Sequence, residues 1–218
     1  MIFIQTMRSR TRPSGLITVS FIEEARRKQI IDATIAAVAE TGYAGASLAK
    51  LAARAKISKS IISYHFAGKD ELLEQTVHQI YGEIWNAVRP RLLAERTAAG
   101  QLRAYLEAEF AYLEENRAQL LTISYILMNH RDRNGRLYLH EEAEKTNLEM
   151  LGKMLEEGQK TGEFRDFAVL PMAATLMHSI NGALGQWASN PNLSLTDYAR
   201  ELVTIFDLAT RKPTKTRK

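Results

Sequence analysis

The stretch ISKSIISYHFAGK, residues 57–69, combines two kinds of side chain that one helix would separate onto opposite faces. Lys59, Ser60 and Tyr64 form hydrogen bonds, whereas Ile62 is apolar. A core helix has no place for the polar residues, and a fully solvated helix has no use for the isoleucines. Lysine, serine and tyrosine side chains suit the base edges and phosphate oxygens of DNA. The stretch therefore predicts a helix that packs through one face and contacts a polar partner through the other.

A helix of this kind needs neighbours that hold it in place, and the preceding residues supply them. Apolar residues at helical spacing predict a supporting helix over 22–41. Ser47 is suited to cap a short helix over 48–55, and Ser58 to cap a third helix over 59–66. Two short helices joined by a tight turn after a longer helix are the layout of a helix-turn-helix.

Glycines mark the limits of this motif. Gly42 is well placed to end the first helix, and Gly68 to end the third. Lys69 then begins a long fourth helix, whose first turn contains Asp70 and Glu71, as the helix dipole favours.

In a helix-turn-helix that binds DNA, the second helix lies in the major groove and needs apolar backing, which Ile57, Ile62 and Phe66 would provide. The candidates for reading bases are Lys59, Ser60, Ile61 and Tyr64. The candidates for phosphate contacts are Ser47, Ser63, Tyr64, His65 and Lys69. A surface helix in an ordinary helical bundle is the alternative that the spacing leaves open.

The net charge of +4 hides an uneven distribution. Residues 1–69 contain 11 Lys and Arg against 4 Asp and Glu, and residues 211–218 add 5 basic side chains. Residues 70–210 contain 13 basic against 21 acidic side chains. A basic N-terminal part on an acidic body predicts a polyanionic partner for the first part only.

Helical patterning continues along the rest of the chain and alternating strand patterns are absent, which predicts an all-α fold. Further helices are expected over 100–115, 117–130, 137–159, 170–189 and from Ser194 to Thr210, with breaks at Pro90 and at Ala98–Gly100. The predicted parts are a basic arm at 1–21, a helix-turn-helix domain at 22–73, a larger helical domain at 74–210 and a basic tail at 211–218. Arg8, Arg10 and Arg12 of the arm either follow the DNA backbone or minor groove or belong to an unused extension.

No sequence motif indicates an enzyme, a metal site or a membrane segment. The HExxH, GxSxG, P-loop and dinucleotide motifs are absent, and the five histidines lack the spacing of metal ligands. The absence of cysteine excludes disulfides and suits a reducing cytoplasm. No apolar run has the length of a membrane span, and the opening MIFIQTM is too short for a signal-peptide core. We therefore expect a cytoplasmic protein without catalytic residues, metal or cofactor.

The run TGYAGASLAKLAARAKISKSIISYHFAGKDELL, residues 41–73, resembles the DNA-binding domain of TetR-family transcriptional regulators. EEGQKTGEF, residues 156–164, is similar to the end of a long helix in the second domain of that family. Two positions depart from the family pattern. Lys56 stands where members often have glycine, so a left-handed backbone there would cost about 1 kcal/mol. Ser63 stands where many members have tyrosine, which shortens or removes a phosphate contact.

The resemblance implies a two-fold dimer interface on the last two helices, where small and apolar residues recur at helical spacing. The interface candidates are Ala174, Gly182, Gly185, Leu195, Tyr198, Leu202, Ile205 and Phe206. Packing within one subunit is the alternative for these residues.

The resemblance also implies a small-molecule pocket in the second domain. The candidates for its lining are Trp85, Tyr105, Phe110, Tyr125, Met128, Tyr138, Met177, His178, Asn181 and Trp187. Three of these, Tyr125, His178 and Asn181, are candidate polar anchors, and we expect His178 and Asn181 to point inward together.

The expected function is a ligand-responsive regulator, acting as a repressor, that binds a palindromic double-stranded DNA operator as a homodimer. The expected effector is a small apolar or cationic molecule, because residues 70–210 are acidic. Two alternatives stay open: an architectural DNA-binding protein without an effector, and a helical small-molecule-binding module or enzyme that no longer binds DNA.

Overall fold

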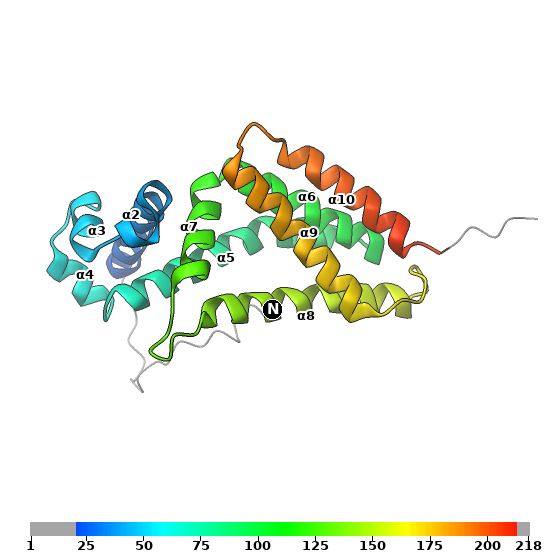
Figure 1. Cartoon of the computed structure of the whole chain (residues 1–218), viewed down its shortest axis with the longest axis horizontal. Helices are drawn as coiled ribbons and strands as arrows, with labels where there is room; N and C mark the ends of the chain where they lie inside the picture. The colour runs from blue at the N-terminus through cyan, green and yellow to red at the C-terminus, as the bar shows by residue number, and fades with distance from the viewer. Residues whose placement is uncertain (1–20, 213–218) are drawn as a thin grey trace, which may run out of the picture. The chain divides into compact units, whose positions relative to one another are not determined.

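The computed structural model describes residues 21–212, and these residues form helices joined by short connections (Figure 1). The predicted all-α class is confirmed, since the described part contains only an isolated β-bridge between Phe164 and Arg211 besides its helices. The helices are α2 (Phe21–Gly45), α3 (Leu48–Arg54), α4 (Lys59–His65), α5 (Lys69–Ala94), α6 (Ala98–Glu115), α7 (Arg117–Asn129), α8 (Tyr138–Lys160), α9 (Val169–Ser189) and α10 (Leu195–Thr210). Arg8, Arg10 and Arg12 of the basic arm lie outside the described residues, as do residues 213–218 of the tail.

Contacts between residues divide the chain into two compact units. The first unit contains α2, α3, α4, the part of α5 up to residue 82, and residues 121–140. Its buried side chains include Ile30, Val38, Leu51, Ile62, Phe66 and Leu72. Thr122 on α7 donates a hydrogen bond of 2.9 Å to the carbonyl oxygen of Ile35 on α2. The domain limits of 22–73 and 74–210 stay a prediction.

Local signals in the sequence set the limits of the first helices. The Ser47 hydroxyl accepts a hydrogen bond from the Lys50 backbone N–H, and the Ser58 hydroxyl accepts one from that of Ile61, so both serines cap their helices as predicted. Gly42 has φ 70° and ψ 177°, which interrupts helical geometry inside α2 at the predicted position. Lys56 has φ 55°, so the turn between α3 and α4 does use a left-handed residue.

The second unit contains residues 83–120 and the described residues from 141 onward, with α6, α8, α9 and α10 as its main helices. α10 packs against both α6 and α9. Buried side chains of this unit include Leu106, Phe110, Leu155, Leu176, Leu195 and Phe206. The Phe164 ring lies against Gly158 of α8, at a position where only a glycine leaves room for it.

The predicted break at Pro90 is wrong, because α5 continues through this residue to Ala94. The break lies at residues 95–97, where the Thr97 hydroxyl accepts a hydrogen bond of 3.0 Å from the Gly100 N–H. Gly100 therefore belongs to the first turn of α6 rather than to a connection. A threonine cap is a stronger signal for a helix start than the nearby glycine is for a loop.

Candidate nucleic-acid interface

The helix α4 separates its side chains into a buried and an exposed face. Ile62 and the adjoining Phe66 are fully buried, whereas Tyr64 is 76% exposed. Lys59, Ser60 and Ser63 are also exposed, while Ile61 and His65 are half-buried. These four exposed polar residues thus share the accessible face of α4, and the apolar residues anchor its other face.

Contacts from α2 hold α4 and α3 in place. Arg27 donates a hydrogen bond to the carbonyl oxygen of His65, and its guanidinium lies 4.3 Å from the centre of the Phe66 ring. Gln29 donates a hydrogen bond of 3.0 Å to the Ala55 carbonyl oxygen at the end of α3. Both contacts use the carbonyl groups that helix ends leave without partners. Sequence reasoning missed Arg27 and Gln29, since polar residues on a first helix are usually solvated.

Three of the candidate DNA contacts already have hydrogen-bond partners within the chain. The Ser60 hydroxyl lies 2.7 Å from that of Ser58. Lys69 is half-buried, and its ammonium group lies 3.4 Å from the Tyr43 carbonyl oxygen and 4.7 Å from the centre of the Tyr43 ring. Burial lowers the pKa of Lys69, and the charge of Asp70 opposes this shift. The Ser47 hydroxyl accepts the capping hydrogen bond from the Lys50 N–H, and the side chain is exposed beside the start of α3.

A polar cluster joins α2, α5 and the connection between α7 and α8 within the first unit. His130 is buried; its Nδ1 lies 3.2 Å from the Tyr43 hydroxyl, and its Nε2 lies 3.8 Å from Glu74 Oε1. Tyr138 donates a hydrogen bond to Glu74, and its hydroxyl lies 3.4 Å from His130 Nε2. The pKa of Glu74 is lowered, mainly by His130 and also by Tyr138, while burial opposes the shift.

One predicted ligand-lining residue, Tyr138, belongs to this cluster. Tyr138 begins α8 and contacts Glu74 of α5, so its hydroxyl is used within the first unit. Sequence reasoning missed Tyr43, Glu74 and His130 as a group, because they are far apart in the chain. The only local signal was the aromatic ring of Tyr43 directly after Gly42.

The other predicted ligand-lining residues fall into two groups. Tyr105, Phe110, Met177 and Trp187 are buried in the second unit, where Trp85 is half-buried. Tyr125 and Met128, in the first unit, are exposed on α7. His178 and Asn181 are exposed on α9, so the expectation that they point inward is wrong. The buried face of α9 instead follows Met177, Ile180 and Leu184, which leaves His178 and Asn181 on the opposite side.

The predicted interface residues are also divided. Leu195, Leu202 and Phe206 are buried within the chain, because this face of α10 packs inside the second unit. Ala174 and Tyr198 are half-buried, and Tyr198 donates a hydrogen bond to Gln186. Gly182, Gly185 and Ile205 are exposed. An added Cβ at Gly182 or Gly185 would meet no atom within 4 Å, so packing within the chain does not require a glycine at either position.

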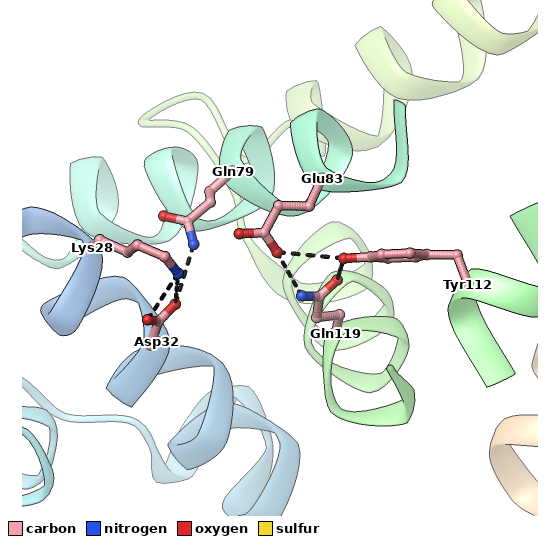
Figure 2. A network of polar contacts seen from close by, with 6 residues as sticks. All are labelled: Lys28, Asp32, Gln79, Glu83, Tyr112 and Gln119. Carbon is pink, nitrogen blue, oxygen red and sulfur yellow. Dashed lines mark hydrogen bonds and ion pairs between the residues drawn. The ribbon is translucent and has the colours of Figure 1, made fainter. Parts of the chain in front are cut away.

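Figure 2 shows two groups of polar contacts that use neighbouring turns of α5. In the first unit, Gln79 donates a hydrogen bond of 3.2 Å to Asp32, which also pairs with Lys28. In the second unit, Glu83 accepts hydrogen bonds from Gln119, at 2.6 Å, and from Tyr112, at 3.4 Å. Burial raises the pKa of Tyr112, and Glu83 adds to the shift while Gln119 opposes it. α5 is therefore tied by side chains to other helices in each unit.

Within residues 21–212 no three His, Asp or Glu side chains lie close enough together to hold a metal ion. In the same range, no helix combines the length and the apolar character needed to cross a membrane.

The helix-turn-helix is similar to that of a known family of proteins. Residues 30–76 match the family described as "Bacterial regulatory proteins, tetR family". The chain is 43% identical over 90 residues to the HTH-type transcriptional regulator BetI of Paraburkholderia phytofirmans, which is 41% of this chain and 46% of that regulator. The chain thus spans about half the length of the curated relatives it matches.

Solved structures show the same fold over most of the chain. One is SmeT, the repressor of the Stenotrophomonas maltophilia multidrug efflux pump SmeDEF, with a TM-score of 0.74 and 21% identity over 89% of this chain and 95% of SmeT. Another is the transcriptional regulator FadR from Bacillus subtilis in complex with stearoyl-CoA, with a TM-score of 0.73 and 21% identity over 82% of this chain and 96% of FadR. Through residues 30–76 the chain is therefore similar to the bacterial regulatory proteins of the tetR family.

Proposed function

We propose that this chain is a transcriptional repressor that binds a palindromic DNA operator as a homodimer and releases it when a small molecule binds. The observation that carries the proposal is the accessible polar face of α4, with Lys59, Ser60 and Tyr64, on a helix anchored by buried Ile62 and Phe66. The similarity of residues 30–76 to a family of regulatory proteins supports the same function.

In the proposed complex, α4 lies in the major groove. Lys59 and Ser60 face base edges near the start of the helix, and Ile61 contacts a thymine methyl group. Tyr64 extends from the exposed face toward bases or phosphates. Ser47 and the N-terminus of α3 hold the DNA backbone.

Lys69 and Ser60 have to leave or share their present partners if they contact DNA. The Lys69 ammonium would have to turn away from Tyr43, and the Ser60 hydroxyl would share Ser58 with its new partner. Lys59 has no such conflict on the exposed face, so we rank it first among the basic contacts.

The proposed dimer forms through the exposed faces of α9 and α10. Glycine inside a helix costs about 1 kcal/mol relative to alanine, and packing within the chain does not explain Gly182 and Gly185. A second copy approaching closely along α9 would explain both. Ile205, 52% exposed, and Leu208, 54% exposed, add apolar surface on α10. Two copies place two recognition helices on successive major grooves, which requires a spacing of about 34–36 Å or a further whole turn.

Effector control is proposed to act through α5 and the polar cluster around His130. α5 has side-chain contacts in both units, and the cluster ties α2 to α5 and to the connection between α7 and α8. An effector that favours a different placement of these helices weakens DNA binding. By linkage, DNA weakens effector binding by the same factor. A typical coupling of about 1–3 kcal/mol would lower operator affinity roughly 5- to 150-fold.

Enrichment of bound sequences from a random DNA pool tests the DNA-binding part of the proposal. We expect a palindromic site and an affinity for it far above that for random DNA. The Lys59→Ala variant should bind the site more weakly and discriminate less at the bases that Lys59 contacts. Ser60→Ala should change the preferred bases. Lys153→Ala, an exposed position on α8, is the matched control and should change neither property.

The alternatives give different results in the same experiment. An architectural DNA-binding protein would show little difference between the enriched site and random DNA. A helical small-molecule-binding module would not bind DNA at all. A Lys59→Ala variant with unchanged affinity and preference would contradict the placement of α4 in the groove.

A further inference from the structure

Glu109 on α6 is half-buried, and its carboxyl group is enclosed but only partly satisfied by hydrogen bonds. Its Oε2 is enclosed and has no hydrogen-bond partner within residues 21–212. A hydrogen bond links its carboxyl group to Tyr105, one turn earlier on the same helix. The surrounding positions of α6 are apolar and buried, including Leu106, Ala108 and Phe110. Glu109 is therefore a polar group on an otherwise apolar part of the second unit.

Enclosing this carboxyl group lowers the free energy of unfolding, and no ion pair within the described part of the chain compensates for that loss. Burial raises the pKa of Glu109 from 4.5 to about 7, and the Tyr105 hydrogen bond only partly opposes the shift. Buried polar groups in folded proteins nearly always have partners, and carboxyl groups with strongly shifted pKa values gather at functional sites. No Lys or Arg ion pair of Glu109 is found in the described part of the chain.

Arg117 Nε is the other enclosed polar side-chain atom of residues 21–212 without a hydrogen-bond partner. The rest of the Arg117 guanidinium, however, makes two contacts. Its Nη2 donates a hydrogen bond of 2.6 Å to the Ala188 carbonyl oxygen, and the group lies 5.7 Å from the centre of the Trp187 ring. Its role in tying α7 to α9 is sufficient to explain it. Glu109 has no comparable structural role.

We propose that Glu109 is the polar anchor of the effector site, and that the effector is a molecule with an ammonium or N–H donor group on an apolar body. The proposal rests on the ligand control inferred above and specifies the chemical class of the ligand. An N–H donor would give Glu109 Oε2 the partner it lacks, in a charge-assisted hydrogen bond. Buried Phe110, Met177 and Trp187 of the same unit are the candidates to contact the apolar body.

This inference excludes an effector whose anionic group would lie at Glu109. A carboxylate or phosphate there would face a second acidic group in an apolar setting, where like charges repel strongly. The FadR structure from Bacillus subtilis contains stearoyl-CoA, an anionic ligand. A similar fold at 21% identity therefore does not transfer that ligand class to this chain.

The test uses the full-length chain and three probes with the same hydrocarbon tail: n-octylamine, 1-octanol and octanoate. Binding is measured by calorimetry, and the affinity for the enriched DNA site is measured with and without each probe. We expect the amine to bind about 10- to 100-fold more tightly than the alcohol, the range of a hydrogen bond to a charged group, and octanoate to bind most weakly. The amine should also weaken DNA binding.

Two matched variants on α6 separate the role of Glu109 from general effects. Glu109→Gln keeps the shape of the side chain but removes its charge, and should remove the preference for the amine while leaving DNA binding without probe unchanged. Glu107→Gln changes an exposed carboxylate on the same helix and should keep the preference. Far-ultraviolet circular dichroism and DNA binding establish that each variant is folded.

The outcomes distinguish this inference from the proposed function. If the amine does not bind, or if Glu109→Gln keeps the preference for it, the assignment of Glu109 is overturned. If octanol or octanoate alone weakens DNA binding, ligand control stands and the ligand class is wrong. If the wild-type chain binds no specific DNA site, the proposed function itself fails whatever the probes do.

Discussion

At the scale of single residues, Lys56 has the one left-handed backbone conformation of a non-glycine residue within residues 21–212, with φ 55°. It stands in the turn that sets the angle between α3 and α4, and this conformation costs an L-residue about 1–2 kcal/mol. We expect Lys56→Gly to raise the free energy of unfolding by about 1 kcal/mol relative to Lys56→Ala, which keeps the Cβ. Chemical denaturation of both variants measures the difference, and equal stabilities would show that the turn carries no strain.

The carboxyl group of Glu109 gives a second prediction at this scale, about pH. Its pKa is raised from 4.5 in the unfolded chain to about 7 in the folded chain. Between these values the folded state binds more protons than the unfolded state, so the free energy of unfolding falls as pH rises through this window. Relative to Glu109→Gln, the wild type should lose on the order of 3 kcal/mol between pH 4.5 and well above pH 7.

Denaturation of both proteins at several pH values measures this loss. Other titrating groups contribute equally to both proteins and cancel in the difference. A difference that stays constant with pH would mean that the Glu109 carboxyl titrates normally and is well solvated.

At the scale of secondary-structure elements, α8 contains two glycines in very different surroundings. An added Cβ at Gly158 would overlap the Phe164 ring, whereas one at Gly152 would meet only Val169 Cγ1, at 3.9 Å. We expect Gly158→Ala to lower the free energy of unfolding by about 1–3 kcal/mol, because the ring must move. Gly152→Ala should raise it by up to about 1 kcal/mol through helix propensity.

Thermal or chemical unfolding of these two variants gives a direct comparison within one helix. The packing of Phe164 on α8 also affects the contact with α10. The backbone N–H of the following residue, Arg165, donates a hydrogen bond of 2.8 Å to the carbonyl oxygen of Thr210 at the end of α10. A Gly158→Ala variant as stable as the wild type would contradict the close packing of the Phe164 ring against α8.

At the scale of the whole molecule, the two faces of α10 predict different effects of substitution. Ile205 is 52% exposed, whereas Phe206 is buried within the chain. We expect Ile205→Glu to weaken the proposed dimer at least about tenfold while the chain stays folded, because a charge would be buried at the interface. Sedimentation equilibrium measures the change. Phe206→Glu should instead destabilise the subunit itself.

Lys153→Glu, an exposed charge change on α8, is the control for the dimer experiment and should leave the association unchanged. A wild-type chain that sediments as a monomer at micromolar concentration would contradict the interface. So would an Ile205→Glu variant that associates as tightly as the wild type.

The sequence alone was sufficient for features that depend on neighbours along the chain. Ser47, Ser58 and Gly42 act where they were expected, because helix caps and helix ends are decided by the geometry of a few consecutive residues. The division of α4 into an apolar and a polar face followed from helical periodicity. The same local signals predicted the wrong break near Pro90, since a proline can stay inside a long helix that packing supports.

Only the tertiary structure decided which polar residues are buried and which apolar residues pack within the subunit. His130 meets Tyr43 and Glu74 through segments distant in sequence, and nothing in the residues around His130 predicts that contact. His178 was expected inside and is exposed, whereas Glu109 fits a solvated helix face by its type and has an enclosed carboxyl oxygen. The physical reason is the same in each case. Helical periodicity determines which residues share a face, but burial of that face depends on other helices that pack against it.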